Sequence, residues 1–231
     1  MRRIKAIFIK QAKDMLKNPI ALLPFIIFPV IALIMTELVA KGNEDIPDNM
    51  FVTMMSAIFA GFGMLQSSAA IIAEDIEKKS LRFLIMAGVK PYEYLLGIGG
   101  FLLFAGVVVS ASFGLIGGFT STDFLKFFTV MIISISSSVT LGATIGLMSK
   151  NQQAAAGASV PIAVILGFTP MIANFNETVE KAAGILYTQQ LNVIVNDFSA
   201  NFIKAIVIMG INITVLAVLF IIAYRKKGLK A

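Results

Sequence analysis

The chain lacks two residue types on which much enzyme chemistry depends, because its 231 residues include no cysteine and no histidine. Without cysteine it can form neither a disulfide nor a thiolate nucleophile. Without histidine it lacks the commonest metal ligand and the usual general base near neutral pH. Charged residues make up only 14% of the chain, whereas a soluble domain carries about a quarter. These absences argue against a soluble enzyme and leave the apolar residues to be explained.

Long uncharged stretches are the main feature of the sequence that remains. From Tyr94 to Thr122, for example, there is no charged side chain. Crossing about 30 Å of hydrocarbon takes roughly twenty helical residues at 1.5 Å per residue. We therefore predict an all-α membrane protein with a single transmembrane domain over residues 1–231. The predicted spans cover residues 19–40, 51–73, 94–118, 124–147, 153–173 and 202–224.

The net charge of +6 is distributed in a way that indicates membrane topology and not nucleic-acid binding. With the N-terminus in the cytoplasm, fifteen of the 19 basic residues fall in inner segments, and only Lys41, Lys126, Lys181 and Lys204 fall outside. The positive-inside rule then predicts that both termini are cytoplasmic. The first apolar stretch is too long for a signal-peptide core, so we interpret it as a retained span. We expect a multi-pass protein of the cell (plasma) membrane.

Residues 3–18 precede the first predicted span and have the pattern of an amphipathic helix. Apolar side chains fall on one side and charged ones on the other, which is typical of a helix in the cytoplasmic interface near anionic headgroups. The residues that define it are Phe8 on the apolar side and Lys10, Lys13 and Lys17 on the charged side. The alternative is a basic flank that only orients the first span.

Small and hydroxylated residues inside the spans allow two interpretations. The fourth span contains a run of serines and then Gly142 and Gly146 at small-xxx-small spacing. Such residues commonly mediate close helix packing and hydrogen bonds between helices. The alternative is that polar residues line a substrate path, for which the candidates are Gln66, Ser67, Ser134, Ser137 and Ser138.

The stretch from Asn174 to Asn201 is too long for a tight turn and too polar to span a membrane. Apolar residues recur within it, so we predict one or two short outer helices before the last span. These would pack on, or dip into, the outer mouth of the bundle. Backbone at that depth is tolerated only where protein or water satisfies its polar groups.

The loop between the second and third predicted spans is the most specific segment. Its acidic residues come first and its basic residues later, so a helix over about 75–87 would have its macrodipole complemented. Gly88 and Pro91 follow as stop signals. A short amphipathic helix that projects into the cytoplasm is suited to docking on another protein. The candidate docking residues are Glu74, Asp75, Glu77, Lys78, Ser80, Leu81, Leu84 and Ile85.

This loop resembles that of the permease subunits of ATP-binding cassette exporters of the type-2 permease family. In that family the loop after the second span begins with acidic residues and continues with a glutamate followed by a Gly-Thr-Leu-x-x-Leu core. A proline and a Leu-Leu-Gly-Lys-like sequence, here called the restart, then lead into the third span. The matching residues here are Glu77, Ser80, Leu81 and Leu84 in the core and Pro91, Leu95, Leu96 and Gly97 in the restart. Lys79 and Ile98 replace the usual glycine and lysine. The restart looks most like that of small permeases of peptide-export and peptide-immunity systems.

The resemblance implies that this chain forms the membrane path and that a separate subunit hydrolyses ATP. It implies that residues 75–87 form a coupling helix in a cleft of an ABC ATPase subunit, and that residues 3–17 form a connecting helix touching the same subunit. Two permease chains, as a homodimer or a related heterodimer, would work with two ATPase subunits, which would hold ATP and magnesium. This chain has no Gly-x-x-x-x-Gly-Lys-Ser/Thr phosphate loop, and we expect no cofactor or metal in it. Leu81→Asp or Leu84→Asp is then expected to uncouple the chain from the ATPase and to leave it inserted and folded.

Two other classes of function compete with an exporter. An ion-coupled carrier or channel usually buries ionisable residues at mid-membrane, whereas Glu37, Lys126 and Lys204 all fall near span ends. An intramembrane enzyme would need an activated nucleophile, and the serines have no histidine beside them. Within the exporter interpretation we expect an amphipathic or hydrophobic substrate. A peptide such as a toxin or bacteriocin comes first, followed by a drug or a lipid-linked molecule.

Overall fold

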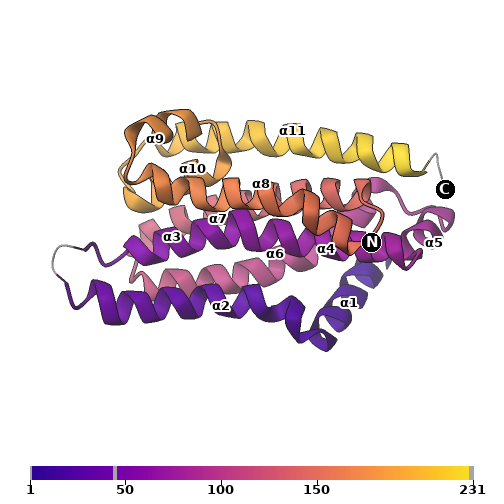
Figure 1. Cartoon of the computed structure of the whole chain (residues 1–231), viewed down its shortest axis with the longest axis horizontal. Helices are drawn as coiled ribbons and strands as arrows, with labels where there is room; N and C mark the ends of the chain where they lie inside the picture. The colour runs from indigo at the N-terminus through magenta and orange to yellow at the C-terminus, as the bar shows by residue number, and fades with distance from the viewer. Residues whose placement is uncertain (1, 44–45, 229–231) are drawn as a thin grey trace.

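The computed structural model describes residues 2–43 and 46–228, and the regular elements in these ranges are all helices (Figure 1). In chain order they are α1 (Arg2–Lys17), α2 (Pro19–Met35), η1 (Thr36–Ala40), α3 (Met50–Ile58), η2 (Phe59–Gly63), α4 (Met64–Glu77), α5 (Ser80–Met86), α6 (Pro91–Ile116), α7 (Ser121–Met148), α8 (Gln152–Ala173), α9 (Glu177–Ala183), α10 (Tyr187–Asn196) and α11 (Phe202–Gly228).

Six helical segments among the described residues are long and apolar enough to cross a membrane, which confirms the predicted all-α membrane fold. The π-helices η1 and η2 are wide turns inside spans, so α2 continues into η1, and α3, η2 and α4 form one span. In Figure 1, α1, α5 and the last turn of α11 lie at one end of the bundle, here called the basal end. The helices α9 and α10 lie at the opposite, distal end, where they form the predicted short helices before the last span.

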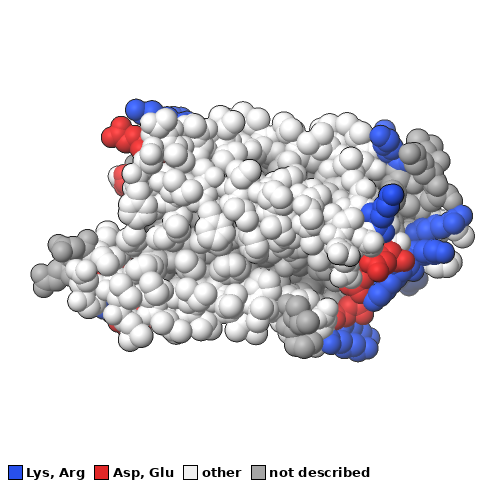
Figure 2. All heavy atoms as spheres, viewed as in Figure 1, with Lys and Arg blue, Asp and Glu red and all other residues white. Residues whose placement is uncertain are grey.

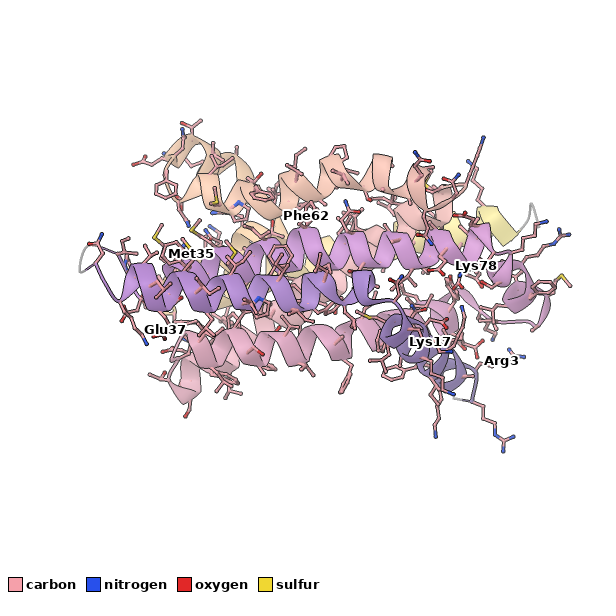
Figure 3. The ribbon with its side chains drawn as sticks, turned by 60° about the horizontal axis from the view of Figure 1, so that its bottom comes forward. Arg3, Lys17, Met35, Glu37, Phe62 and Lys78 are labelled. Carbon is pink, nitrogen blue, oxygen red and sulfur yellow. The ribbon has the colours of Figure 1, made fainter. Side chains whose placement is uncertain are left out.

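Charged side chains lie at the two ends of the bundle. On the face shown in Figure 2, lysine, arginine, aspartate and glutamate gather at the ends, and a wide band without charged residues separates them. Figure 3 shows Arg3, Lys17 and Lys78 at the basal end and Glu37 at the distal end. This is the surface that a bundle embedded in hydrocarbon requires, because an isolated charge there is strongly disfavoured.

Local sequence signals explain where several helices begin. The side-chain oxygen of Asn151 accepts the backbone N–H of Ala154 at 2.8 Å and caps α8. Asn176 caps α9 in the same way, by accepting the backbone N–H groups of Thr178 and Val179. Each cap satisfies a donor that has no partner within the helix itself. The caps therefore fix the short connections on either side of α8.

Helix α7 and the span made of α3, η2 and α4 form the centre of the bundle. In the most apolar stretch of each, 72% of the residues are buried, against 17% in α11. Gly142 and Gly146 allow α7 to approach α4 very closely. A Cβ atom on Gly142 would lie 2.2 Å from the carbonyl oxygen of Leu65, and one on Gly146 would lie 2.7 Å from that of Ala69. Small residues are the usual means of close helix packing in membranes, where the hydrophobic effect does not drive helices together.

A second close approach involves η2, which the sequence did not indicate. A Cβ atom on Gly61 would lie 2.8 Å from the backbone of Leu166 in α8, and one on Gly167 would lie 3.0 Å from the Cβ of Phe62. The wide turn of a π-helix shifts the residues that follow it around the helix axis. The face of α4 that reaches the basal end is therefore set by η2.

The α4–α7 contact predicts that Gly142→Ala destabilises the fold. The added methyl group would clash with the backbone of α4, and overpacking of this kind costs about 1–3 kcal/mol. Gly157→Ala is the matched control, because nothing lies within 4 Å of a Cβ atom there. Thermal unfolding of the purified variants in detergent measures the difference. Equal stability of the two variants would contradict the assignment of Gly142 to a tight helix contact.

Candidate functional site

The segment predicted as one helix over about 75–87 is two helices joined by a turn. Helix α4 continues through Glu74, Asp75 and Glu77, and α5 begins only at Ser80. Between them Lys79 has a φ of 58°, in the left-handed region that ends a helix. The acidic residues assigned to the short helix therefore belong to the end of the second span, and α5 projects from that end as a separate element.

The side chain of Asp75 is the centre of the basal end. It is only 5% exposed, and its carboxylate accepts hydrogen bonds from Lys10 Nζ at 2.6 Å, Ser80 Oγ at 2.6 Å and Tyr94 OH at 2.9 Å. The three donors come from α1, α5 and α6. A buried carboxylate needs such partners, because loss of hydration is otherwise very unfavourable. This group, here called the Asp75 cluster, joins four helices at one point.

Further polar contacts fix the loop that follows α5. Arg3 donates to the carbonyl oxygen of Gly88 at 2.7 Å and lies 3.5 Å from the carboxylate of Glu93. On the other side of the loop, Tyr224 OH donates to the carbonyl oxygen of Val89 at 3.1 Å. The loop is thus held by both the first and the last helix of the described chain.

Two other predicted docking acids stabilise neighbouring elements. Glu77 accepts the backbone N–H of Gln152 at 3.1 Å and so contacts the start of α8. Glu74 accepts a hydrogen bond from Lys78 one turn further along the chain, and this bond raises the pKa of the Lys78 ammonium. Both acids favour order at the basal end, and neither lies on α5.

The orientation of α5 differs from the sequence expectation. Leu81 is only 3% exposed, and Leu84 and Ile85 are partly buried against the core. The exposed apolar residues are instead Phe83, at 65%, and Met86, at 70%. The expectation that Asp at Leu81 leaves the fold intact is therefore wrong, because a buried charge without a partner strongly disfavours folding.

Sequence reasoning missed Phe83 and Met86 because five of the seven residues of α5 are apolar. A periodic pattern identifies a buried face only where polar residues mark the opposite face. Here Arg82 is the only charged residue, and it lies beside Phe83 on the exposed side. Its position is the one signal that could have located that side.

Helix α1 packs on the bundle through a face slightly different from the predicted one. The buried residues are Ile7, Gln11 and Met15, while Phe8 is partly buried with its ring 5.6 Å from that of Phe101. Among the predicted charged residues, Lys10 turns into the Asp75 cluster, and Lys13 and Lys17 are exposed. Between α1, α4 and α5 a cavity of about 370 Å³ is lined by Lys10, Asp14, Lys17, Glu74 and Lys78, among others.

The candidate path residues fall into two groups. Gln66 and Ser67 line a groove of about 250 Å³ between α2, α4 and α8. Ser134, Ser137 and Ser138 are instead fully buried in the bundle. Ser137 Oγ donates to its own helix, and Ser138 Oγ shares a hydrogen bond of 2.6 Å with the hydroxyl of Tyr187 in α10. The serines of α7 thus lie at helix contacts, apart from the groove.

Of the five candidate path residues, Gln66 and Ser134 have a buried polar atom without a hydrogen-bond partner. In the groove Gln66 Oε1 accepts from Ser159 at 2.8 Å, while Gln66 Nε2 has no protein partner. In the core Ser134 Oγ has none either. Within the described residues there is also no group of three acidic, cysteine or histidine side chains that could hold a metal ion.

Comparison with protein families connects this geometry to a class of membrane protein. A family model described as ABC-2 type transporter matches residues 2–202. The match covers α1, the Asp75 cluster, α5 and the helices up to the start of α11. A search of curated proteins found no similar sequence.

The Asp75 cluster predicts that Asp75→Ala destabilises the chain by about 2 kcal/mol, because it leaves the buried Tyr94 hydroxyl without its acceptor. Asp14→Ala is the control, since the exposed carboxylate of Asp14 lies 3.9 Å from the same Lys10 ammonium. Its effect should stay within about 0.5 kcal/mol. Thermal unfolding in detergent gives both values, and similar losses for the two variants would show that burial of Asp75 is not what matters.

Proposed function

The chain belongs to the ABC-2 type transporter family as a membrane-spanning permease subunit, and we propose that it exports an amphipathic or hydrophobic substrate from the cell. Family membership implies work with an ABC ATPase subunit. We infer two copies of that subunit, which hold the ATP and magnesium, and a second permease chain that is either a copy of this chain or a relative. ATP hydrolysis lies outside this chain, which has no phosphate loop.

The observation that carries the proposal is the form of α5. It projects from the basal end with Phe83 and Met86 exposed, while Leu81 anchors its other face in the core. Exposed large apolar side chains on a short helix are typical of a docking surface for another protein. We therefore assign the contact with the ATPase to Phe83 and Met86, with Arg82 beside them.

The Asp75 cluster supplies the mechanical connection. Because Asp75 joins α4 to α1, α5 and α6, a displacement of α5 would move these helices together. Packed helices shift as rigid elements between discrete arrangements. ATP can drive the shift only if it binds one conformation of the whole complex more tightly than the other. In this proposal the basal end converts closure of the ATPases into movement of the first three spans.

The groove between α2, α4 and α8 is our candidate for the substrate path. It combines apolar surface with the side chains of Gln66 and Ser67, and the buried amide nitrogen of Gln66 lacks a protein partner. Such a surface suits a molecule with both apolar and polar parts. We favour an amphipathic peptide such as a toxin or bacteriocin, ahead of a hydrophobic drug or a lipid-linked molecule.

The proposed orientation puts the basal end in the cytoplasm of a cell (plasma) membrane. The basic residues Arg3, Lys17 and Lys78 at this end follow the positive-inside rule. Lys230, part of the same argument, lies outside the described residues. The exposed apolar faces of α2 and α8, with Ile26 and Ile165 each about 60% exposed, would contact lipid or the second permease.

The ion-coupled carrier receives little support. Lys126, at the distal end of α7, donates to the carbonyl oxygen of Phe198 at 2.5 Å. Glu37 pairs with Lys41 at 2.6 Å, and both side chains are about half exposed. These charges have local structural partners at the end of the bundle, whereas a coupling ion needs a site within the membrane.

Purification of the tagged chain from its native membrane tests the proposal. We expect a near-stoichiometric partner that contains a phosphate-loop lysine, identified by mass spectrometry of the complex. Transport that stops on ATP depletion and persists without an ion gradient would agree with this result. Recovery of the chain alone, under conditions that preserve complexes, would favour the carrier or channel.

The docking face predicts different effects for neighbouring residues of α5. Phe83→Asp or Met86→Asp should leave folding unchanged and reduce capture of the ATPase by about tenfold or more, since aromatic and apolar anchors dominate such interfaces. Leu81→Asp should instead lower the amount of folded chain, because Leu81 is buried.

The matched control for these variants is Ile185→Asp. Ile185 is 73% exposed and lies between α9 and α10 at the distal end, so the same change of charge occurs away from the proposed contact. Co-purification with the ATPase and size-exclusion chromatography measure binding and folding separately. Normal ATPase capture by Phe83→Asp and Met86→Asp together would reject the docking face.

A further inference from the structure

The cavity of about 370 Å³ between α1, α4 and α5 lies beside the Asp75 cluster, and we call it the α1 cavity. Its wall on the α1 side includes Gln11, Asp14, Met15 and Asn18. These residues recur every three or four positions, so they form one stripe along the helix. Asp14 and Asn18 are exposed, so the cavity is open to the surroundings at the basal end.

Gln11 is the buried polar residue of the α1 cavity that has no partner. It is only 6% exposed, and it lines the cavity. Within the described residues neither its Oε1 nor its Nε2 atom forms a hydrogen bond, and neither belongs to the atoms that the protein seals off completely. The amide therefore keeps a small accessible surface in the cavity. An amide that is buried without partners is costly, so its place here points to a ligand that hydrogen-bonds to it.

The charges around the α1 cavity are balanced. Three lysines and three acids line it, namely Lys10, Lys17, Lys78, Asp14, Glu74 and Asp75. Lys10 lies 2.6 Å from Asp75 and 3.9 Å from Asp14. Lys78 donates to Glu74. Lys17 has no acid within 4 Å among the described residues, but it is exposed, and an exposed charge contributes little. The cavity therefore has no net charge that would favour either an anion or a cation.

We propose that the α1 cavity binds an uncharged end group that both donates and accepts hydrogen bonds, such as an amide. Gln11 Nε2 donates to the carbonyl oxygen of this group, and Gln11 Oε1 accepts from its N–H. A carboxylate has no donor for Oε1, and an ammonium has no acceptor for Nε2. Either ion would also lose hydration without gaining an unpaired counter-charge inside the cavity.

The apolar part of the same ligand fits the groove beside Gln66, because the α1 cavity continues into that groove. The residues that line both are Met15, Asn18, Ala21, Ile71 and Glu74. An amphipathic molecule can therefore place its polar end at Gln11 and its apolar end in the groove. This inference rests on the proposed function and narrows its substrate class to solutes with an amide-like polar end. Every peptide bond supplies such a group.

The test uses the absence of cysteine from the chain. In Ala21→Cys the introduced thiol lies where the cavity meets the groove. Its reaction with N-ethylmaleimide, an uncharged reagent, is followed by mass spectrometry of the full chain in lipid nanodiscs, without ATP or an ATPase. The probes are octanamide, octanoate and octylammonium, whose apolar chains have nearly the same length. We expect octanamide to slow the reaction saturably, and the two ions to need about tenfold higher concentrations for the same protection.

Ile185→Cys is the control for probes that only dissolve in the membrane. Ile185 is 73% exposed at the distal end, away from the α1 cavity, so no probe should protect its thiol. Three outcomes would overturn the proposal: equal protection of Ala21→Cys by the three probes, no saturable protection, or the same protection of Ile185→Cys.

Two variants, made in the Ala21→Cys background, place the polar end at Gln11. Gln11→Leu removes the amide and keeps the size of the side chain, so it should keep thermal stability and weaken octanamide protection by about tenfold. Gln11→Glu leaves a negatively charged acceptor and should bind octylammonium more tightly than octanamide. Gln153→Leu is the matched control, because Gln153 is exposed in α8 and lines neither the cavity nor the groove. It should leave protection unchanged.

Unchanged octanamide protection in Gln11→Leu, or a retained preference for octanamide in Gln11→Glu, would reject the role of Gln11. If Gln11→Leu loses stability, Gln11→Glu decides. The assay needs neither transport nor a partner subunit. A negative result therefore removes this site and the amide-like end group, whereas failure of the permease function would appear as the absence of an ATPase from the purified complex.

Discussion

Burial of one carboxylate organises the basal end. Asp75 lies at the end of a membrane span and is only 5% exposed, and a buried carboxylate needs hydrogen-bond donors around it. Those donors come from α1, from Ser80 at the start of α5 and from Tyr94 in α6, so the positions of three helices follow from one requirement. Helix α5 has only seven residues and would not be stable alone. Its place in the molecule depends on this anchor and on Leu81.

Close backbone packing explains why such an anchor can move helices together. Gly142 and Gly146 bring α7 against α4, and Gly61 brings η2 against α8. Where the backbones of two helices are in contact, no side chain lies between them that could change its rotamer to accommodate a small shift. In the proposed function, the span made of α3, η2 and α4 would carry a displacement of α5 toward the groove beside Gln66.

The two ends of the bundle differ in the way they satisfy polar groups. At the basal end Asp75 has three donors, and Arg3 and Tyr224 hold the loop after α5. At the distal end α9 and α10 leave the oxygens of Gln189 and Asn192 without partners beside a cavity.

The membrane class, the number of spans and the position of the loop between the second and third spans could all be predicted from the sequence. Those features depend on length, hydropathy and charge, which are properties of the chain. The tertiary structure decided which face of α5 is exposed, that Glu74 and Asp75 end a span, and that Ser137 and Ser138 lie in helix contacts. It also formed the polar cavity at the distal end from residues between Pro47 and Ala200. The exposed face of α5 could not be predicted because α5 itself carries apolar residues on most of its sides, so its sequence does not mark the side that is buried. Which side is buried is then settled only by what packs against it.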